Sequence, residues 1–153
     1  MDNTTLLNLA ANFGTPLYVY DGNKIEEKIN TLREAFPEIR IKIKYACKAN
    51  TNISVLSLMK KLGVEVDVVS PQEMHLAFKA GFTPEQVTFT SSGVGFEEIE
   101  ECLNHGVLVN VDNLSALEKF GQKYGNTKPL FIRTRPNVEG GGNLKISTGH
   151  GNS

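Results

Sequence analysis

The sequence predicts an α/β fold in which short strands alternate with amphipathic helices. Stretches rich in β-branched residues recur every 20 to 23 residues, beginning at residues 41, 64, 87, 107 and 130. Apolar residues at helical spacing occupy the intervals between them. Because parallel strands must be joined by crossovers, usually helices, this alternation indicates a mostly parallel sheet with right-handed connections.

The elements follow in chain order. The first predicted helix runs from about residue 24 to 36, with Asp21 as its N-cap. Four of its side chains are expected to face inward: Ile25, Ile29, Leu32 and Phe36. Strands are predicted at 41–46, 64–69, 87–90, 107–111 and 130–134. Three apolar stripes indicate helices between these strands: Ile53, Leu56, Met59 and Leu62; Ile99 and Leu103; Leu114, Leu117 and Phe120.

Local signals mark where several helices begin and end. Gly63, Gly81 and Gly106 stand where a helix needs a left-handed residue just past its end. Ser70 is predicted as an N-cap, followed by a proline in the first helical position and by Glu73 closing a capping box.

Two segments fit the repeat less simply. Residues 15–21 (TPLYVYD) are strand-like but lie outside it, and they would need a partner sheet that the repeat does not supply. In the first strand, Lys42, Lys44 and Lys48 fall on one side, whereas a central parallel strand is apolar on both faces. Either that strand begins after residue 41, or one of its ends is exposed to water.

Five βα units fit two architectures. One is an open, doubly wound sheet, and the other is the first part of a (β/α)8 barrel, which takes about 250 residues when complete. The chain ends in a glycine-rich stretch, residues 140–151, with no closing helix. Together with the extra strand-like segment, this ending favours the barrel, truncated before closure.

Composition excludes several classes of function. Sixteen lysines and arginines against seventeen acidic residues give a net charge of -1, which argues against a nucleic-acid or anionic-membrane partner. We expect a cytoplasmic protein, because residues 1–14 lack the features of a secretory signal and no apolar run is long enough to span a bilayer. Cys47 and Cys102 are too few for a disulfide framework and lack zinc-site spacing.

Reactive groups of parallel βα proteins gather at the carboxyl ends of the strands. The predicted strands place Lys48, Asp67 and Arg133 there, with Ser91, Ser92, Asn110 and Asp112 at the two strand ends between them. A lysine in such a place can form a Schiff base with a carbonyl. It is also one of sixteen basic residues, which commonly extend along a surface into water. Ser70 and Glu73 are explained by helix capping alone.

Other candidates are weaker. Gly93-Val94-Gly95 lacks the third glycine of a dinucleotide fingerprint. His75, His105 and His150 are not spaced as metal ligands, so no metal site is predicted; the first two are expected on the surface. Cys47 has no visible partner base. The run of glycines at 140–142 is either a loop or a lid over a site.

Several motifs, taken together and in order, resemble one enzyme family. They are residues 15–21 (TPLYVYD), 45–50 (YACKAN), 66–73 (VDVVSPQE), 109–112 (VNVD), 132–136 (IRTRP) and 146–149 (ISTG). The chain is similar over nearly its whole length to the N-terminal part of the diaminopimelate decarboxylases, which belong to the alanine-racemase-like pyridoxal-phosphate (PLP) barrels.

The resemblance implies a role for each candidate residue. Lys48 would carry PLP as a Schiff base, and Asp67, Ser70, Glu73 and Arg133 would line the cofactor or support its neighbours. The reaction would be loss of CO2 from meso-diaminopimelate to give L-lysine, in lysine biosynthesis. Residues 1–21 would pack on a C-terminal β domain, and residues 22–153 would form the first βα units of the barrel. The full-length enzyme is expected to be a homodimer.

The chain departs from the family at Cys47, where valine is more frequent, and at Phe96, where many relatives place a lysine. The family's ring-stacking histidine, phosphate-binding turn and ring-nitrogen acid come after the last residue of this chain, so the 153 residues alone are expected to be inactive. Other PLP-barrel decarboxylases, acting on ornithine, arginine or carboxynorspermidine, remain alternatives. A non-catalytic PLP-binding protein is another.

Overall fold

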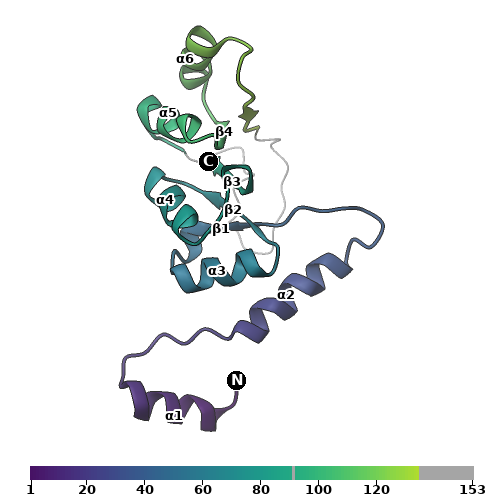
Figure 1. Cartoon of the computed structure of the whole chain (residues 1–153), viewed down its shortest axis with the longest axis vertical. Helices are drawn as coiled ribbons and strands as arrows, with labels where there is room; N and C mark the ends of the chain where they lie inside the picture. The colour runs from purple at the N-terminus through teal and green to yellow at the C-terminus, as the bar shows by residue number, and fades with distance from the viewer. Residues whose placement is uncertain (91, 135–153) are drawn as a thin grey trace, which may run out of the picture. The chain divides into compact units, whose positions relative to one another are not determined.

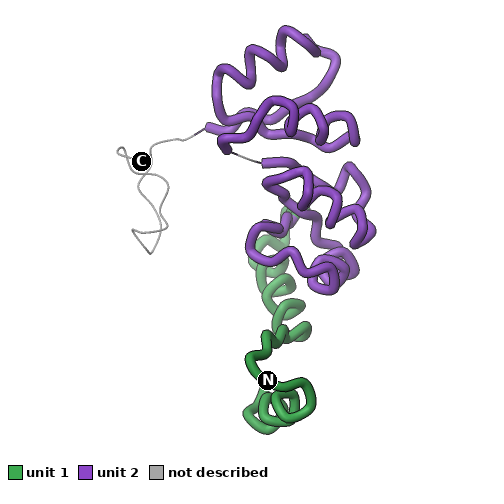
Figure 2. Tube along the Cα trace, turned by 90° about the vertical axis from the view of Figure 1, so that its left-hand side faces the viewer, with its two compact units in different colours: residues 1–42 green, residues 43–153 purple. Residues whose placement is uncertain are grey.

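The computed structural model describes residues 1–90 and 92–134. They belong to two compact units, Met1–Lys42 and Ile43–Ser153, shown in different colours in Figure 2. The glycine run at 140–142, His150 and the motif at 146–149 lie outside the described residues.

The first unit contains helices α1 (Asn3–Phe13) and α2 (Gly22–Glu34). Each begins at an aspartate whose carboxylate accepts a backbone hydrogen bond, Asp2 from Thr5 at 2.7 Å and Asp21 from Lys24 at 3.2 Å. The predicted cap at Asp21 is therefore confirmed. Helix α1 is an element that the sequence pattern did not predict.

Side chains of α2 are more exposed than its apolar stripe suggested. Ile29 is buried, but Leu32 and Phe36 are each 44% exposed, so their inward placement is wrong within this structure. The unit has two helices and no sheet of its own to cover the stripe. Residues 15–21 are assigned to no strand, and Tyr18 among them is 87% exposed. Packing of this segment on a further β domain stays a prediction.

The second unit is built on a five-stranded sheet. Its strands are β1 (Lys44–Ala46), β2 (Glu65–Val68), β3 (Val87–Thr90), β4 (Leu108–Val111) and β5 (Phe131–Ile132). Its helices are α3 (Ile53–Lys61), α4 (Pro71–Lys79), α5 (Phe96–Asn104) and α6 (Leu114–Tyr124), with short 3-10 turns at Cys47–Ala49 and Pro84–Gln86.

The strand order decides between the two predicted architectures. All neighbouring strands are parallel, and their order in the sheet is the order in the sequence, β1-β2-β3-β4-β5. A doubly wound sheet reverses direction at a switch point, whereas a barrel does not. Helices α3 to α6 lie along one side of the sheet (Figure 1), as successive crossovers of one hand require.

Four strands are shorter than predicted, the first and the last by three residues each. Strand β1 begins at Lys44 rather than at residue 41, although the carbonyl of Ile43 already accepts a hydrogen bond from the N–H of Glu65 at 3.0 Å. Lys42 therefore precedes the strand. Of the two explanations for the row of lysines, the structure supports a strand that begins after residue 41. Strand β5 has only two residues, against five predicted.

The two faces of this sheet differ in polarity. Val66, Val68, Phe89 and Val109 face the helices and have no exposed surface. The register pairs Asp67 with Thr88, and Thr90 with Asn110, so these residues share the opposite face. We call that surface the polar face: Glu65, Asp67, Thr88, Thr90 and Asn110. The expectation of strands apolar on both faces is met on the helix side alone, because the helices cover only that side.

The helices bury their apolar stripes against the sheet. Leu56, Met74, Cys102 and Phe120 are at most 1% exposed. Leu114 was expected in this core but is 76% exposed, because it is the first residue of α6 and lies just past the carboxyl end of β4.

The predicted helix ends are confirmed: Gly63, Gly81 and Gly106 have φ angles of 70°, 95° and 79°. Among residues 1–90 and 92–134, no helix combines the length and the apolar character needed to cross a membrane.

Candidate active site

Lys48 lies at the carboxyl end of β1, in the 3-10 turn Cys47–Ala49, and its side chain is exposed. Two hydrogen bonds fix this turn: the N–H of Asn50 donates to the carbonyl of Cys47 at 3.0 Å, and the hydroxyl of Tyr45 donates to the carbonyl of Asn50 at 3.2 Å. The register pairs Ala46 with Asp67 of β2. Lys48 therefore follows a strand that lies next to the strand of Asp67, at the carboxyl end of the sheet.

Ser70 and Glu73 hold the turn from β2 into α4. The hydroxyl of Ser70 accepts a hydrogen bond from the N–H of Glu73 at 3.2 Å, as predicted for an N-cap. The carboxylate of Glu73, however, accepts from the N–H of Val69 at 2.9 Å, not from that of Ser70. The reciprocal capping box is therefore wrong by one residue, and the carboxylate instead ties the end of the strand to the helix.

Cys47 is buried behind this turn. Burial, and secondly the negative charge of Glu73, raise the pKa of its thiol to about 11. A thiol with so high a pKa is protonated at neutral pH and is not a nucleophile. The same charge effect places the carboxylate of Glu73 near the residue that precedes Lys48.

Arg133 follows β5 and is exposed. Its Nη1 donates a hydrogen bond to the Oγ of Ser92 at 3.1 Å, across 41 residues of sequence. Asp112 follows β4, and its pKa is lowered by hydrogen bonds from the side chains of Asn113 and then Ser92, with a smaller contribution from the charge of Arg133. Three strand ends thus contribute one group each to a second cluster.

The candidate residues therefore fall in two clusters at the carboxyl end of the sheet. The first is Lys48, Asp67, Ser70 and Glu73, at the ends of β1 and β2. The second is Ser92, Asp112 and Arg133, at the ends of β3, β4 and β5. The hydrogen bond that Arg133 donates to Ser92 lies within the second cluster. The sequence marks Ser92 and Asp112 only as residues at strand ends, and that position is the signal that identifies them.

The polar face between the clusters contains an acceptor in need of a donor. The Oδ1 of Asn110 is buried and has no hydrogen-bond partner among the described residues. Buried carbonyl oxygens of this kind are rare, because an unmet acceptor is costly. An amine, an acid, a guanidinium and an open acceptor around one polar surface suit an aldehyde-bearing, anionic, heteroaromatic cofactor such as PLP.

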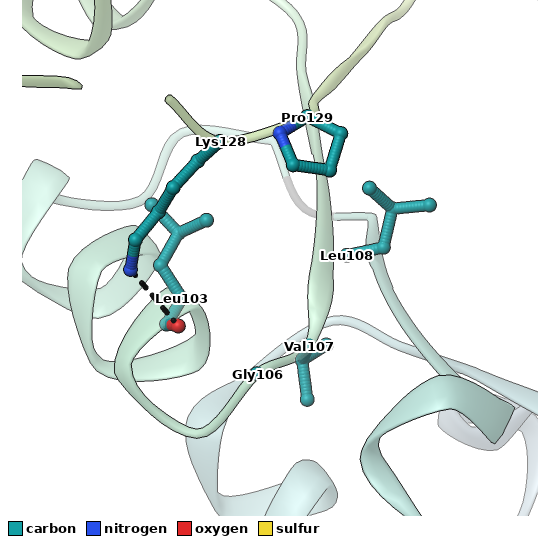
Figure 3. Close-up of a pocket in the computed structure, with 6 residues that line it drawn as sticks. All are labelled: Leu103, Gly106, Val107, Leu108, Lys128 and Pro129. Atoms are coloured by element: carbon teal, nitrogen blue, oxygen red, sulfur yellow. Dashed lines mark hydrogen bonds between the residues drawn. The ribbon is translucent and has the colours of Figure 1, made fainter. Parts of the chain in front are cut away.

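Two other features lie elsewhere. His75 and His105 are exposed on α4 and just after α5, as expected, and the Nε2 of His75 is 2.9 Å from a carboxylate oxygen of Glu101. A hollow lies at the amino ends of β4 and β5, where Lys128 donates to the carbonyl of Leu103 at 3.3 Å (Figure 3). This hollow is at the opposite end of the strands from Lys48.

Residues 1–90 and 92–134 contain no group of three or more side chains arranged to hold a metal ion.

Residues 22–153 match the family described as pyridoxal-dependent decarboxylase, pyridoxal binding domain. This chain belongs to that family. Its fold is the N-terminal part of a PLP-binding (β/α)8 barrel, about five βα units, as the sequence predicted.

Individual relatives agree with this assignment. The chain is 36% identical over 145 residues to a diaminopimelate decarboxylase of Methanothermobacter thermautotrophicus, covering 94% of this chain and 34% of that protein. The crystal structure of diaminopimelate decarboxylase from Helicobacter pylori complexed with L-lysine is 35% identical, with a TM-score of 0.83, over 95% of this chain and 38% of that one.

A lysine/ornithine decarboxylase of Vibrio vulnificus shares the fold, with a TM-score of 0.72, at 22% identity over 84% of this chain and 38% of that one. The chain spans about a third of the length of the curated relatives it matches.

Proposed function

We propose that this chain is the cofactor-attaching part of a PLP-dependent decarboxylase that converts meso-diaminopimelate to L-lysine and CO2. The observation that carries the proposal is the place of Lys48: it is exposed at the carboxyl end of a parallel strand, and the neighbouring strand carries Asp67 on the polar face. A primary amine in that place is open to a carbonyl carbon.

The residues around Lys48 have distinct tasks in this proposal. The Nζ of Lys48 attaches the cofactor covalently. Asp67 supplies a negative charge beside it, and Ser70 and Glu73 hold the turn that keeps the end of β2 in place. Arg133 supplies a positive charge for an anionic group of the cofactor or substrate. PLP, when bound, takes up the electron pair that remains after CO2 leaves.

The choice of substrate rests on the relatives. Those named diaminopimelate decarboxylase are matched at 30–38% identity, whereas the lysine/ornithine decarboxylase shares 22–24%. The activity would belong to a protein long enough to complete the barrel. We further propose that such a protein acts as a homodimer, and that the 153 residues alone release no CO2.

Borohydride trapping tests the attachment site. The protein expressed from its own gene is loaded with PLP, reduced and digested, and the modified peptide is identified by mass. We expect the adduct on Lys48, its loss in Lys48→Ala and its retention in Lys61→Ala, a control at an exposed lysine in the last turn of α3. A trapped adduct on another lysine of the unaltered protein would refute the assignment.

Turnover tests the reaction. CO2 release is measured with meso-diaminopimelate, ornithine, arginine and carboxynorspermidine. We expect release from diaminopimelate in preference to the others. Faster turnover of ornithine or arginine would replace the substrate. PLP trapped at Lys48 without release from any of the four would favour a non-catalytic PLP-binding protein.

A further inference from the structure

Two hydrogen bonds at the start of α6 hold the carboxylate of Asp112, a member of the second cluster. The N–H of Ala116, in the first turn of α6, donates to the Oδ1 of Asn113 at 2.8 Å. The Nδ2 of Asn113 donates to the Oδ1 of Asp112 at 2.9 Å. Asn113 therefore uses both ends of its amide, one to cap the helix and the other to hold the carboxylate of Asp112.

The direction of the remaining bonds follows from chemistry. Arginine can only donate, so the bond of 3.1 Å between Arg133 and Ser92 uses a lone pair of the Ser92 oxygen. The single proton of that hydroxyl is then available to an acceptor, and the side chain of Ser92 is the second of the groups that lower the pKa of Asp112.

The backbone brings these groups together. The register places Thr90 opposite Asn110, and Asn110 opposite Phe131, so the residues two positions after these leave the sheet side by side. Asp112 and Arg133 also border one hollow, together with Leu117 and Ile132. The side chain of Arg133 is otherwise exposed and has many rotamers, which a single fixed partner reduces.

We propose that Ser92 and Asp112 are positioning residues for Arg133: they hold its guanidinium at the carboxyl edge of the sheet, where an anionic group of the cofactor or substrate meets it already oriented. This inference rests on the proposed function, because it needs PLP to bind at this edge. The gain comes from preorganisation, since ordering of the side chain is complete before binding.

A double-mutant cycle on PLP affinity tests the proposal. Equilibrium dialysis of PLP is carried out with the protein expressed from its own gene. We expect Ser92→Ala to weaken binding about fivefold, the size of one hydrogen bond, and Ser92→Thr to retain the affinity through its hydroxyl. Ser115→Ala, a change at an exposed serine of α6, is the matched control and should leave the affinity unchanged.

The cycle separates positioning from general destabilisation. If Ser92 acts through Arg133, Ser92→Ala has no further effect in a protein that already carries Arg133→Ala. An equal loss in both backgrounds, or no loss in either, would overturn the proposal. In parallel, NMR titration should find the pKa of Asp112 raised toward its ordinary value by Ser92→Ala; an unchanged pKa would contradict an interaction between Ser92 and Asp112.

The outcomes also distinguish this inference from the function beneath it. If the unaltered protein traps no PLP on Lys48, the proposed function fails and this inference fails with it. If PLP is trapped on Lys48 but the Ser92 and Arg133 effects simply add, only the positioning role is wrong.

Discussion

The carboxylate of Glu73 accepts a hydrogen bond of 2.9 Å from the backbone N–H of Val69, four residues earlier. This bond ties the first turn of α4 to the residue that follows β2, two positions after Asp67. The same helix end is capped by the hydroxyl of Ser70. The end of β2 is thus fixed by the N-cap residue Ser70 and by a side chain in the first turn of α4.

Removing this tie should destabilise the fold. Glu73→Ala leaves the N–H of Val69 without its acceptor, and we expect the free energy of unfolding to fall by about 1–2 kcal/mol. Glu73→Gln keeps an acceptor oxygen and should lose less than half of that. Urea denaturation measures both. Equal losses in the two variants would mean that the charge of Glu73, and not the hydrogen bond, matters.

Loss of the Ser70 hydroxyl should act on the helix alone. Ser70→Ala removes an N-cap, which typically costs about 1 kcal/mol, and Ser70→Asp should restore most of it. The same urea experiment applies. If Ser70→Ala changed PLP affinity while leaving stability unaltered, Ser70 would contact the cofactor and not merely cap α4.

The buried thiols should be inert in the native state. Burial is the first cause that raises the pKa values of Cys47 and Cys102, to about 11 and about 12. At pH 8 the alkylation rate of the folded chain should be roughly 100-fold or more below that of the urea-unfolded chain. Rapid labelling of Cys47 under native conditions would revive its role as a nucleophile.

The thiols also predict a dependence of stability on alkaline pH. Their native pKa values are raised above the ordinary value of 9.0, so the unfolded chain loses these protons first. Their stabilising contribution is complete below about pH 9 and is lost as the pH rises toward 11 and 12. Cys47→Val should reduce this alkaline loss, and an unaltered pH profile in that variant would assign the loss to other groups.

Asn110 offers a test of the polar face. Its buried Oδ1 has no partner among the described residues, so Asn110→Val removes an unmet acceptor and should raise the free energy of unfolding of this chain by about 1 kcal/mol. Asn110→Asp adds a charge at the same place and should destabilise it. If Asn110→Val destabilised the chain instead, the oxygen would have a bound partner in solution.

An acid-sensitive contact around the carboxylate of Glu100 joins helices α5 and α6. The hydroxyl of Tyr124 donates to the Oε1 of Glu100 at 2.8 Å, and Lys123 pairs with the same carboxylate. Lys123, and secondly Tyr124, lower the pKa of Glu100 below 4.5, so its contribution is present above that pH and is lost as the pH falls further. Tyr124→Phe should make unfolding less sensitive to pH below 4.5, which thermal denaturation at several pH values would reveal.

Much of the local structure was predictable because its causes are local. The caps at Asp21 and Ser70 depend on residues within one turn, and so do the left-handed glycines that end three helices. Strand β3 was predicted to the residue, since a β-branched run is bounded there by a proline turn and by serines. The predictions that failed concern features set by distant parts of the chain. Whether Leu32 and Leu114 are exposed depends on which surface packs over them.

The sequence by itself determined the alternation of strands and helices, the helix ends and the family of the chain, because periodicity, capping and motif order are written in neighbouring residues. Tertiary structure alone decided the sequential strand order, which separates a barrel from a doubly wound sheet, and the polarity of the open face. It also joined Arg133 to Ser92, 41 residues away. Contacts between side chains that distant depend on strand register, and register is set by the packing of the whole sheet against its helices.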